Sequence, residues 1–145
     1  MITLAPSHIE EINGHAEREY PDECCGLLLG RFADDGAKVV AETIAVSNAR
    51  EGADRHNRSL IPPEELLRGE RDARRRGLEV IGNYHSHPDH PARPSQFDLE
   101  HAWPTWSYLI VSVQKNRAGE LLSWELKHDR SRFNSEEIIA VKTKG

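Results

Sequence analysis

The chain has 145 residues, a formal net charge of −5 and two cysteines. This length suits one domain with one hydrophobic core, so we expect a single domain over residues 1–145. The negative charge argues against a general nucleic-acid binder, and no stretch approaches the ~18 apolar residues of a membrane span. Because Cys24 and Cys25 are adjacent, they cannot clip a distant loop, and with no signal-peptide pattern we expect reduced thiols in a cytoplasmic protein.

The first predicted element is an amphipathic helix from Ser7 to about Tyr20. Ser7 and Glu10 have the spacing of a capping box, and apolar residues recur at helical spacing until Pro21 ends the pattern. Two strands, Gly26–Phe32 and Lys38–Asn48, are then expected to form a hairpin around a turn at Asp34-Asp35-Gly36.

A polar, irregular segment from Ala49 to Asn57 precedes a second helix, which is predicted to open at Pro62-Pro63 and run to about Arg76, with Gly77 just past its end. Five arginines between Arg68 and Arg76 give this helix a basic side. Such a side either docks an acidic partner or is a solvated face whose arginines alternate with acidic residues.

The remaining chain alternates strands with short connections. Leu78–His85 is a predicted strand, stopped by a proline-rich loop from Pro88 to Pro94. A short helix follows, and then strands 107–114 and 121–128 are expected around a turn at residues 116–120, with a last short strand in the tail 135–145. Helices between the early strands and antiparallel strands later predict an α/β fold with a mixed sheet.

The chemistry concentrates in YHSHPDHPARPSQFD, residues 84–98. At a strand end, side chains alternate faces, so His85 and His87 point to the same side. Asp98, one turn into the next helix, can join them if the loop reverses the chain. Two imidazoles and one carboxylate are a ligand set of catalytic zinc, with a fourth position open for water.

Other readings of these residues stay open. Ser95 has the spacing of a helix N-cap toward Asp98, and the histidine pair can also be two strand-end residues without a ligand role. His90 and His101 are rival ligands, although loop and helix-surface histidines are more often solvated. There is no HExxH, so spacing does not choose a general base. The remaining histidines have no partner pattern and receive no role: His8, His15, His56 and His128.

The chain resembles the JAMM metallopeptidases of the MPN-domain superfamily. Their pattern of a distant glutamate, H-[ST]-H-P, six residues and S-x-x-D matches His85-Ser86-His87-Pro88, DHPARP and Ser95-Gln96-Phe97-Asp98. PDECCGLLLG, residues 21–30, resembles the helix-to-strand junction that carries the glutamate, here Glu23. The resemblance covers nearly the whole chain and implies a single-domain α/β fold, a mixed central sheet flanked by helices with a cytidine-deaminase-like architecture.

Carried over, the resemblance implies that His85, His87 and Asp98 bind zinc, the one expected cofactor. Glu23 then activates the attacking water and later protonates the leaving amine, while Ser95 donates a hydrogen bond to the developing oxyanion. No acyl-enzyme is implied, so the two cysteines are read as small buried residues. The helix opening at residues 59–67 departs from relatives, which commonly carry an aromatic residue and an aspartate there.

The chain is close to a bare domain, similar to the compact prokaryotic branch of the family. This implies a zinc peptidase or isopeptidase that cleaves after the C-terminal diglycine of a ubiquitin-like or sulfur-carrier protein. The released group is a precursor extension, a lysine adduct or a C-terminal cysteine. Two alternatives are a noncatalytic MPN-type module that binds such tails and a metal hydrolase of small amides. No nucleic-acid or membrane partner is expected.

Overall fold

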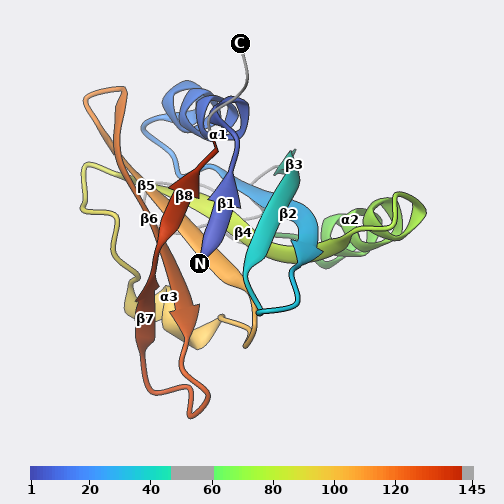
Figure 1. Cartoon of the computed structure of the whole chain (residues 1–145). Coiled ribbons are helices and arrows are strands. Elements are labelled where there is room, and N and C mark those ends of the chain that lie inside the picture. Colours follow the sequence, from blue (N-terminus) through green and yellow to red (C-terminus); the bar gives the residue numbers. More distant parts are fainter. Residues whose placement is uncertain (47–60, 142–145) are drawn as a thin grey trace.

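The computed structural model describes residues 1–46 and 61–141. Within them one sheet has the strand order β7-β6-β5-β4-β2-β3-β1-β8, with parallel and antiparallel neighbours (Figure 1). The strands are β1 (Ile2–Leu4), β2 (Cys25–Phe32), β3 (Lys38–Val46), β4 (Glu79–Pro88), β5 (Ser107–Gln114), β6 (Arg117–Leu126), β7 (Phe133–Glu136) and β8 (Ile138–Ala140). The helices are α1 (Pro6–Glu19), α2 (Pro63–Arg75) and α3 (Gln96–Glu100). The predicted α/β fold with a mixed sheet is confirmed.

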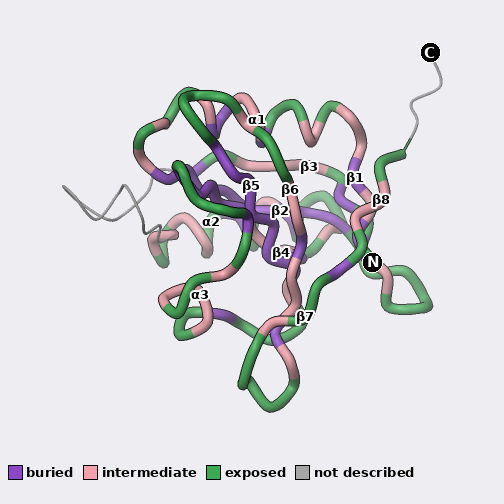
Figure 2. Tube along the Cα trace, turned by 90° about the vertical axis from the view of Figure 1, so that its left-hand side faces the viewer, coloured by how far each residue is buried: buried purple, intermediate pink, exposed green. Residues whose placement is uncertain are grey.

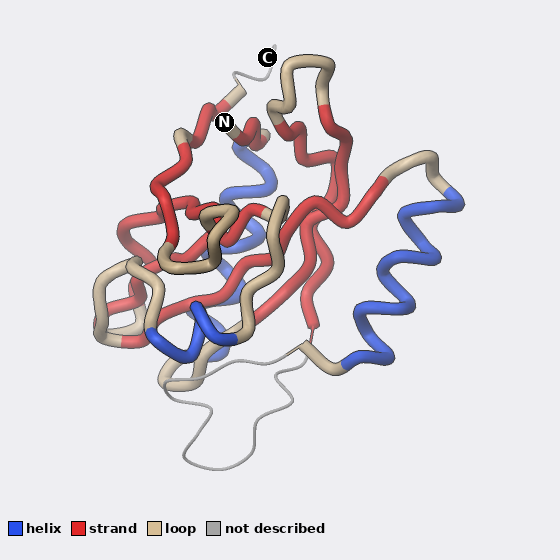
Figure 3. Tube along the Cα trace, turned by 90° about the horizontal axis from the view of Figure 1, so that it is seen from below, coloured by secondary structure: helices blue, strands red, loops and turns tan. Residues whose placement is uncertain are grey.

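The two long helices cover opposite faces of the sheet because β2 is apolar on both sides. Leu28 belongs to the core under α1, and its neighbour Leu27 belongs to the core under α2. Figure 2 shows buried residues concentrated on β2, β4 and β5, and Figure 3 shows the strands between the two long helices. Gly69 lets α2 approach closely, since a Cβ there would lie 2.5 Å from Leu27. None of the described helices is long and apolar enough to cross a lipid bilayer.

The sheet curls so far that its two edges meet. β7 and β8 are separated by one residue, Glu137, yet β7 pairs with β6 at one edge and β8 pairs with β1 at the other. Glu136, at the end of β7, accepts hydrogen bonds from Ser107 (2.6 Å) and Ser123 (2.7 Å) and an ion pair from Lys38 Nζ (3.4 Å) on the distant strand β3. All four residues are buried, so this polar cluster joins the two halves of the curled sheet.

Several sequence predictions are confirmed with shifted ends. The early hairpin forms between β2 and β3, and α2 stops before Gly77, whose φ of 69° terminates it. The expected end of β3 at Asn48 and the irregular segment 49–57 lie outside the described residues. β4 runs to Pro88 rather than His85, because β5 continues beside it to a Pro88↔Val113 register.

The capping box predicted at Ser7 is wrong. The helix begins at Pro6 with Ala5 as its N-cap, because proline is pre-set for the first helical position and needs no N–H partner there. His8 Nδ1 accepts the Ala5 N–H at 3.1 Å in place of the expected serine cap. Further along, buried His15 forms a 2.7 Å hydrogen bond with the Tyr84 hydroxyl and ties α1 to β4.

The turn predicted at residues 116–120 is also wrong. The β5–β6 hairpin reverses at Lys115-Asn116, both with positive φ (48° and 69°), as a two-residue primed turn requires. The sequence lacks the Asn-Gly signal of such turns, so the early start of β6 was missed. β1 was missed as well, and the tail contributes two strands rather than one, with residues 142–145 outside the description.

The basic side of α2 is partly neutralised by local acids. Arg76 pairs with Glu42 of β3 and with Asp72, and Arg68 lies 3.7 Å from Glu65. These pairs are solvent-accessible and therefore contribute little to stability. They favour the solvated-face interpretation over a dedicated docking surface.

The cluster at Glu136 predicts a pH-dependent loss of stability. Burial raises the pKa of this carboxyl, but hydrogen bonds from Ser107 and Ser123 and the charge of Lys38 outweigh it and hold the pKa below the ordinary 4.5. Its stabilisation is therefore complete above the unfolded pKa and fades as pH falls through the lower folded value. Glu136→Gln should lower the free energy of unfolding by about 2 kcal/mol at neutral pH, as for hydrogen bonds to charged groups.

Urea unfolding of both proteins, at neutral pH and at about pH 3, measures this effect, and the difference between them should shrink at the acid value. Glu120→Gln, a neutralisation at an exposed position, is the control and should change neither curve. A difference that stays constant between the two pH values would contradict the role of the Glu136 charge.

Candidate active site

The site is built where β2 begins and β4 ends. These strands are antiparallel, with Cys25 opposite His85, so the residues just before β2 lie beside the last residues of β4. Ser86 fastens this junction twice, since its hydroxyl accepts the Cys24 N–H at 2.8 Å and its own N–H donates to the Cys24 carbonyl at 3.2 Å. Ser86 points to one side of β4, which leaves the two histidines on the other.

The predicted ligand residues come together. His85 Nε2 and His87 Nε2 lie 3.2 Å apart, and each lies 3.3 Å from one oxygen of Asp98. Atoms bound to one tetrahedral metal at about 2.0–2.1 Å are separated by about 3.3 Å. The three side chains therefore have the spacing of a ligand set, and both imidazoles are buried.

Glu23 joins the same group from the other strand. It precedes β2, is 2% exposed, and offers a carboxylate oxygen within 4.8 Å of the ligand nitrogens of His85 and His87. These three residues could hold or surround a metal ion. The histidine pair is thus shared by two carboxylates, Asp98 from α3 and Glu23 from the start of β2.

Ser95 and Asp98 cap α3 reciprocally. Asp98 N–H donates to Ser95 Oγ at 3.1 Å, and Ser95 N–H donates to Asp98 Oδ2 at 2.8 Å. Because the serine oxygen accepts in this cap, its own O–H remains available as a donor. The N-cap reading of Ser95 is therefore correct and is compatible with a further role. The cap also fixes Asp98 next to the histidines.

Electrostatics keep Asp98 ionised. Burial raises the pKa of its carboxyl, but the charge of His85 and hydrogen bonds from His85, His87 and the Ser95 backbone outweigh it and hold the pKa well below its usual range. An ionised carboxylate is the form that binds metal. Burial, reinforced by the negative charges of Glu19 and Glu23, raises the pKa of the Cys24 thiol and of the Cys25 thiol to about 12, which makes both poor nucleophiles.

The rival histidines lie outside this group of ligand atoms. His90 and His101 are both exposed. His101 Nδ1 is hydrogen-bonded to the Phe97 carbonyl at 2.8 Å, and its ring packs against the Phe97 ring, 4.2 Å between centroids. Both side chains are exposed, as the sequence favoured, although His101 lines the cavity that contains His85 and Asp98 and His90 lines the cavity that contains His87 and Glu23.

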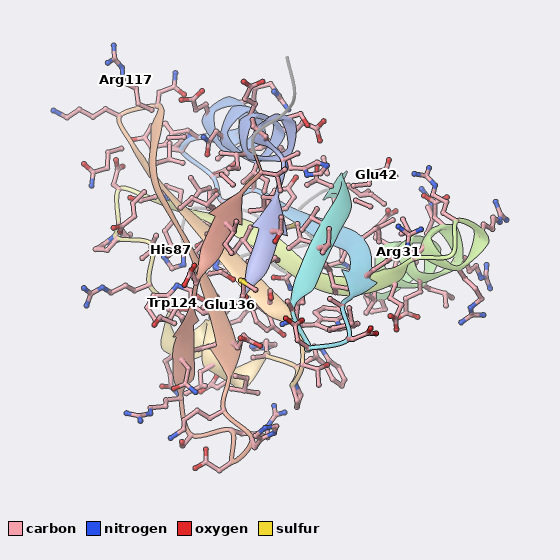
Figure 4. The ribbon with its side chains drawn as sticks, viewed as in Figure 1. Arg31, Glu42, His87, Arg117, Trp124 and Glu136 are labelled. Atoms are coloured by element: carbon pink, nitrogen blue, oxygen red, sulfur yellow. The ribbon has the colours of Figure 1, made fainter. Side chains whose placement is uncertain are left out.

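The loop between the histidines and α3 is held at three successive carbonyls. Ser112 donates to His90 O (2.6 Å), His87 Nδ1 to Pro91 O (2.9 Å), and Trp124 Nε1 to Ala92 O (3.0 Å). Figure 4 labels two of these donors, His87 on β4 and Trp124 on β6. With its Nδ1 committed to a carbonyl, His87 presents Nε2 to the other site residues.

Two cavities meet at the histidine pair. The smaller cavity, called the narrow cavity below, has a volume of about 110 Å³ and lies between α2, α3 and the sheet. Its walls are mostly apolar and aromatic and include Cys25, Ile61, Leu66, Asn83, His85, Phe97, Asp98, Trp103, Trp106 and Tyr108. The larger cavity, called the wide cavity below, has a volume of about 460 Å³. Its lining residues are Glu23, His87, His90, Pro91, Arg93, Ser95, Gln96 and Phe97.

Sequence reasoning predicted the catalytic and ligand residues in these walls but missed the other wall residues of both cavities. Asn83 is the clearest case, since it shares the face of His85 and His87 by period-two alternation and was available from the strand pattern. Its side-chain oxygen is buried and has no hydrogen-bond partner among the described residues. The aromatic residues of the narrow cavity carry no sequence spacing that would have grouped them.

Solved structures share the curled mixed sheet of this chain. A JAB1/MPN domain protein from Archaeoglobus fulgidus shares this fold, with a TM-score of 0.54 and 19% identity over 97% of this chain and 95% of that one. A protein of Desulfitobacterium hafniense, whose structure was solved in solution, superposes with a TM-score of 0.85 at 35% identity over 99% of this chain and 94% of that one.

Residues 5–127 match the family described as prokaryotic homologs of the JAB domain, and the chain belongs to that family. A desampylase from Haloferax volcanii is 34% identical over 77% of this chain and 80% of the relative. A Thermus thermophilus protein named as a probable TtuB-protein conjugate cleaving protease is 33% identical over 76% and 69%, respectively. A CysO-cysteine peptidase from Mycobacterium tuberculosis is 29% identical over 87% and 83%.

The two hydrogen bonds between Ser86 and Cys24 predict that removing the Ser86 hydroxyl lowers the stability of the fold. Ser86→Ala leaves the buried N–H of Cys24 without its acceptor, so the free energy of unfolding should fall by about 1–3 kcal/mol. Urea unfolding compares the two proteins, and equal midpoints for the alanine variant and the wild type would contradict the role of Ser86 in holding the two strands together.

Proposed function

We propose that this protein is a zinc-dependent peptidase or isopeptidase that hydrolyses the amide bond after the C-terminal diglycine of a ubiquitin-like or sulfur-carrier protein. The observation that carries the proposal is the convergence of two imidazoles and two carboxylates between two cavities. The relatives support the substrate class, because their names refer to cleavage of conjugates or adducts of such carriers.

His85, His87 and Asp98 would hold the zinc, and their 3.2–3.3 Å separations fit that role. Bound there, zinc would polarise the scissile carbonyl and bring the pKa of the attacking water close to 7. Glu23 takes the proton of that water and later gives it to the leaving amine. The free O–H of Ser95 donates to the oxyanion that develops on the carbonyl, an interaction worth about 2.7–4 kcal/mol in comparable sites.

The narrow cavity suits the tail of the carrier. A glycine pair fits a cavity of this small volume more easily than residues with side chains do. Asn83 lies two residues before His85 on the same face, about 6.6–6.8 Å along the strand. Since an extended tail advances about 3.3–3.6 Å per residue, the Asn83 amide would pair with a peptide group within two residues of the scissile bond.

Partner class and location follow from the same proposal. The substrate is a folded carrier with a flexible tail, and neither nucleic acid nor membrane takes part. The buried free thiols of Cys24 and Cys25 suit a reducing compartment, which supports a cytoplasmic protein. The noncatalytic alternative, a module that holds the tail without cutting it, predicts tight binding regardless of metal.

Metal analysis tests the ligand set. The wild type should contain about one zinc per chain after purification without chelator, as a site of this ligand composition binds it. The double variant His85→Ala and His87→Ala should contain none. His101→Ala is the matched control, since it removes an exposed histidine near the site and should leave zinc content unchanged. Absence of metal in the wild type after zinc is added back would favour the noncatalytic module.

Turnover tests the role of Glu23. Glu23→Gln should retain zinc content and the free energy of unfolding but lose about 10²–10⁴-fold in kcat on a diglycine-tailed carrier conjugate, as expected for a general acid–base residue. The readout is release of the carrier by mass spectrometry. Unchanged turnover would remove Glu23 from the mechanism. Equal cleavage of small acyl-amines and of carrier conjugates by the wild type would instead favour the small-amide hydrolase.

A further inference from the structure

If the proposed function holds, the leaving group of the reaction occupies the wide cavity. The group that protonates the leaving amine must touch it, and Glu23 lines the wide cavity together with Ser95. The narrow cavity has His85 and Asp98 in its walls instead. The two cavities therefore divide the substrate, with the carrier tail in the narrow one and the released amine in the wide one.

Arg93 supplies the permanent positive charge in the wall of the wide cavity. Its side chain is exposed, and no ion pair joins it to an acidic group within residues 1–46 and 61–141. His90 adds a second polar side chain to the same wall. Among the described residues of this wall, Glu23 is the one carboxylate, and the proposed reaction uses it for proton transfer.

The position of Arg93 is set by a rigid loop. The three residues before it have their carbonyls bound by Ser112, His87 and Trp124, and its own N–H donates to the Pro91 carbonyl at 2.8 Å. Pro91 and Pro94 restrict the backbone on both sides. One of the three anchors is a site histidine, so the arginine and the site are held in a fixed relation.

A guanidinium fork binds a carboxylate through two parallel hydrogen bonds. An amino acid attached through its α-amine carries a carboxylate only two bonds from the scissile nitrogen. A lysine attached through its side chain carries no such anion, because its carboxyl belongs to a peptide bond. The chemistry of the wide cavity thus distinguishes these leaving groups.

We propose that Arg93 binds the α-carboxylate of the leaving group, which makes a carrier bearing one amino acid after its diglycine the favoured substrate class. The reaction remains an amide hydrolysis: water adds to the carbonyl, the C–N bond breaks, and the carrier carboxylate and the free amino acid are the products. Arg93 acts through binding and takes no part in proton transfer.

The test uses two carriers that differ in one group. Each ends in diglycine followed by one alanine, either as the free acid or as the carboxamide. The zinc-loaded wild type should cleave the acid with a kcat/KM about 10- to 100-fold higher, in line with charge-assisted hydrogen bonds. Arg93→Gln should lower the kcat/KM for the acid to the value for the carboxamide and leave the kcat/KM for the carboxamide unchanged.

Arg117→Gln is the charge-matched control. Arg117 lies at the far end of the β5–β6 hairpin and points away from His87 (Figure 4), so this variant should keep the wild-type preference. Binding provides a readout besides turnover. Calorimetry with zinc-loaded Glu23→Gln should show tighter binding of the acid than of the carboxamide, and Arg93→Gln in that background should abolish the difference.

The outcomes separate this proposal from the function on which it rests. Equal cleavage and equal binding of acid and carboxamide by proteins with Arg93 would overturn the carboxylate site and leave the peptidase intact. If Arg93→Gln still prefers the acid over the carboxamide, another group binds the carboxylate, and the role of Arg93 is overturned. Faster cleavage of a lysine-linked conjugate than of the acid would overturn the substrate class. Failure to cleave any carrier would overturn the proposed function, while the calorimetry would still decide the role of Arg93.

Discussion

The pairing of β2 with β4 is the constraint on which the site depends. An antiparallel ladder brings the first residues of one strand against the last residues of the other, so Glu23 and the histidine pair meet although they lie about 60 residues apart in the sequence. Ser86 holds this meeting point with two hydrogen bonds and, by strand alternation, keeps both imidazoles on the opposite side. Ser86 thus holds the two strand ends together, and strand alternation sets the side on which the imidazoles lie.

The curled sheet gives this junction a rigid support. Because β7 and β8 lie at opposite edges, closure brings Lys38, Ser107, Ser123 and Glu136 into one buried cluster. Every hydrogen-bonding demand of the Glu136 carboxylate is met by a neighbour there, which is the condition under which a buried charge is tolerated. The helices α1 and α2 cover the two faces of the sheet, and the cavities of the site open at the C-terminal end of β4.

The loop from Pro88 to Pro94 positions both a ligand residue and a cavity-wall residue. It brings Asp98 back to the histidines, and its anchored carbonyls place Arg93 in the wall of one cavity while α3 borders both. A site between two cavities of different character suits a reaction with two unlike products. The aromatic, narrow side fits a chain without side chains, and the wider, charged side fits a small polar amine.

The sequence by itself determined the strand-end histidine pair, the helix carrying Asp98 and the mixed α/β class, because each depends on local periodicity or on a motif of fixed spacing. Glu23 came only from the resemblance to a family, since spacing does not choose among the glutamates. The helix start moved to Pro6, because proline suits the first helical position better than the Ser7 cap that was expected, and the hairpin turn moved to Lys115-Asn116, which lacks the usual Asn-Gly signal. Only the tertiary structure decided the curl of the sheet, the Lys38–Glu136 cluster and the two cavities with Asn83 and Arg93 in their walls. These features join residues distant in sequence, and no periodicity within one strand or helix records which distant side chain it will face.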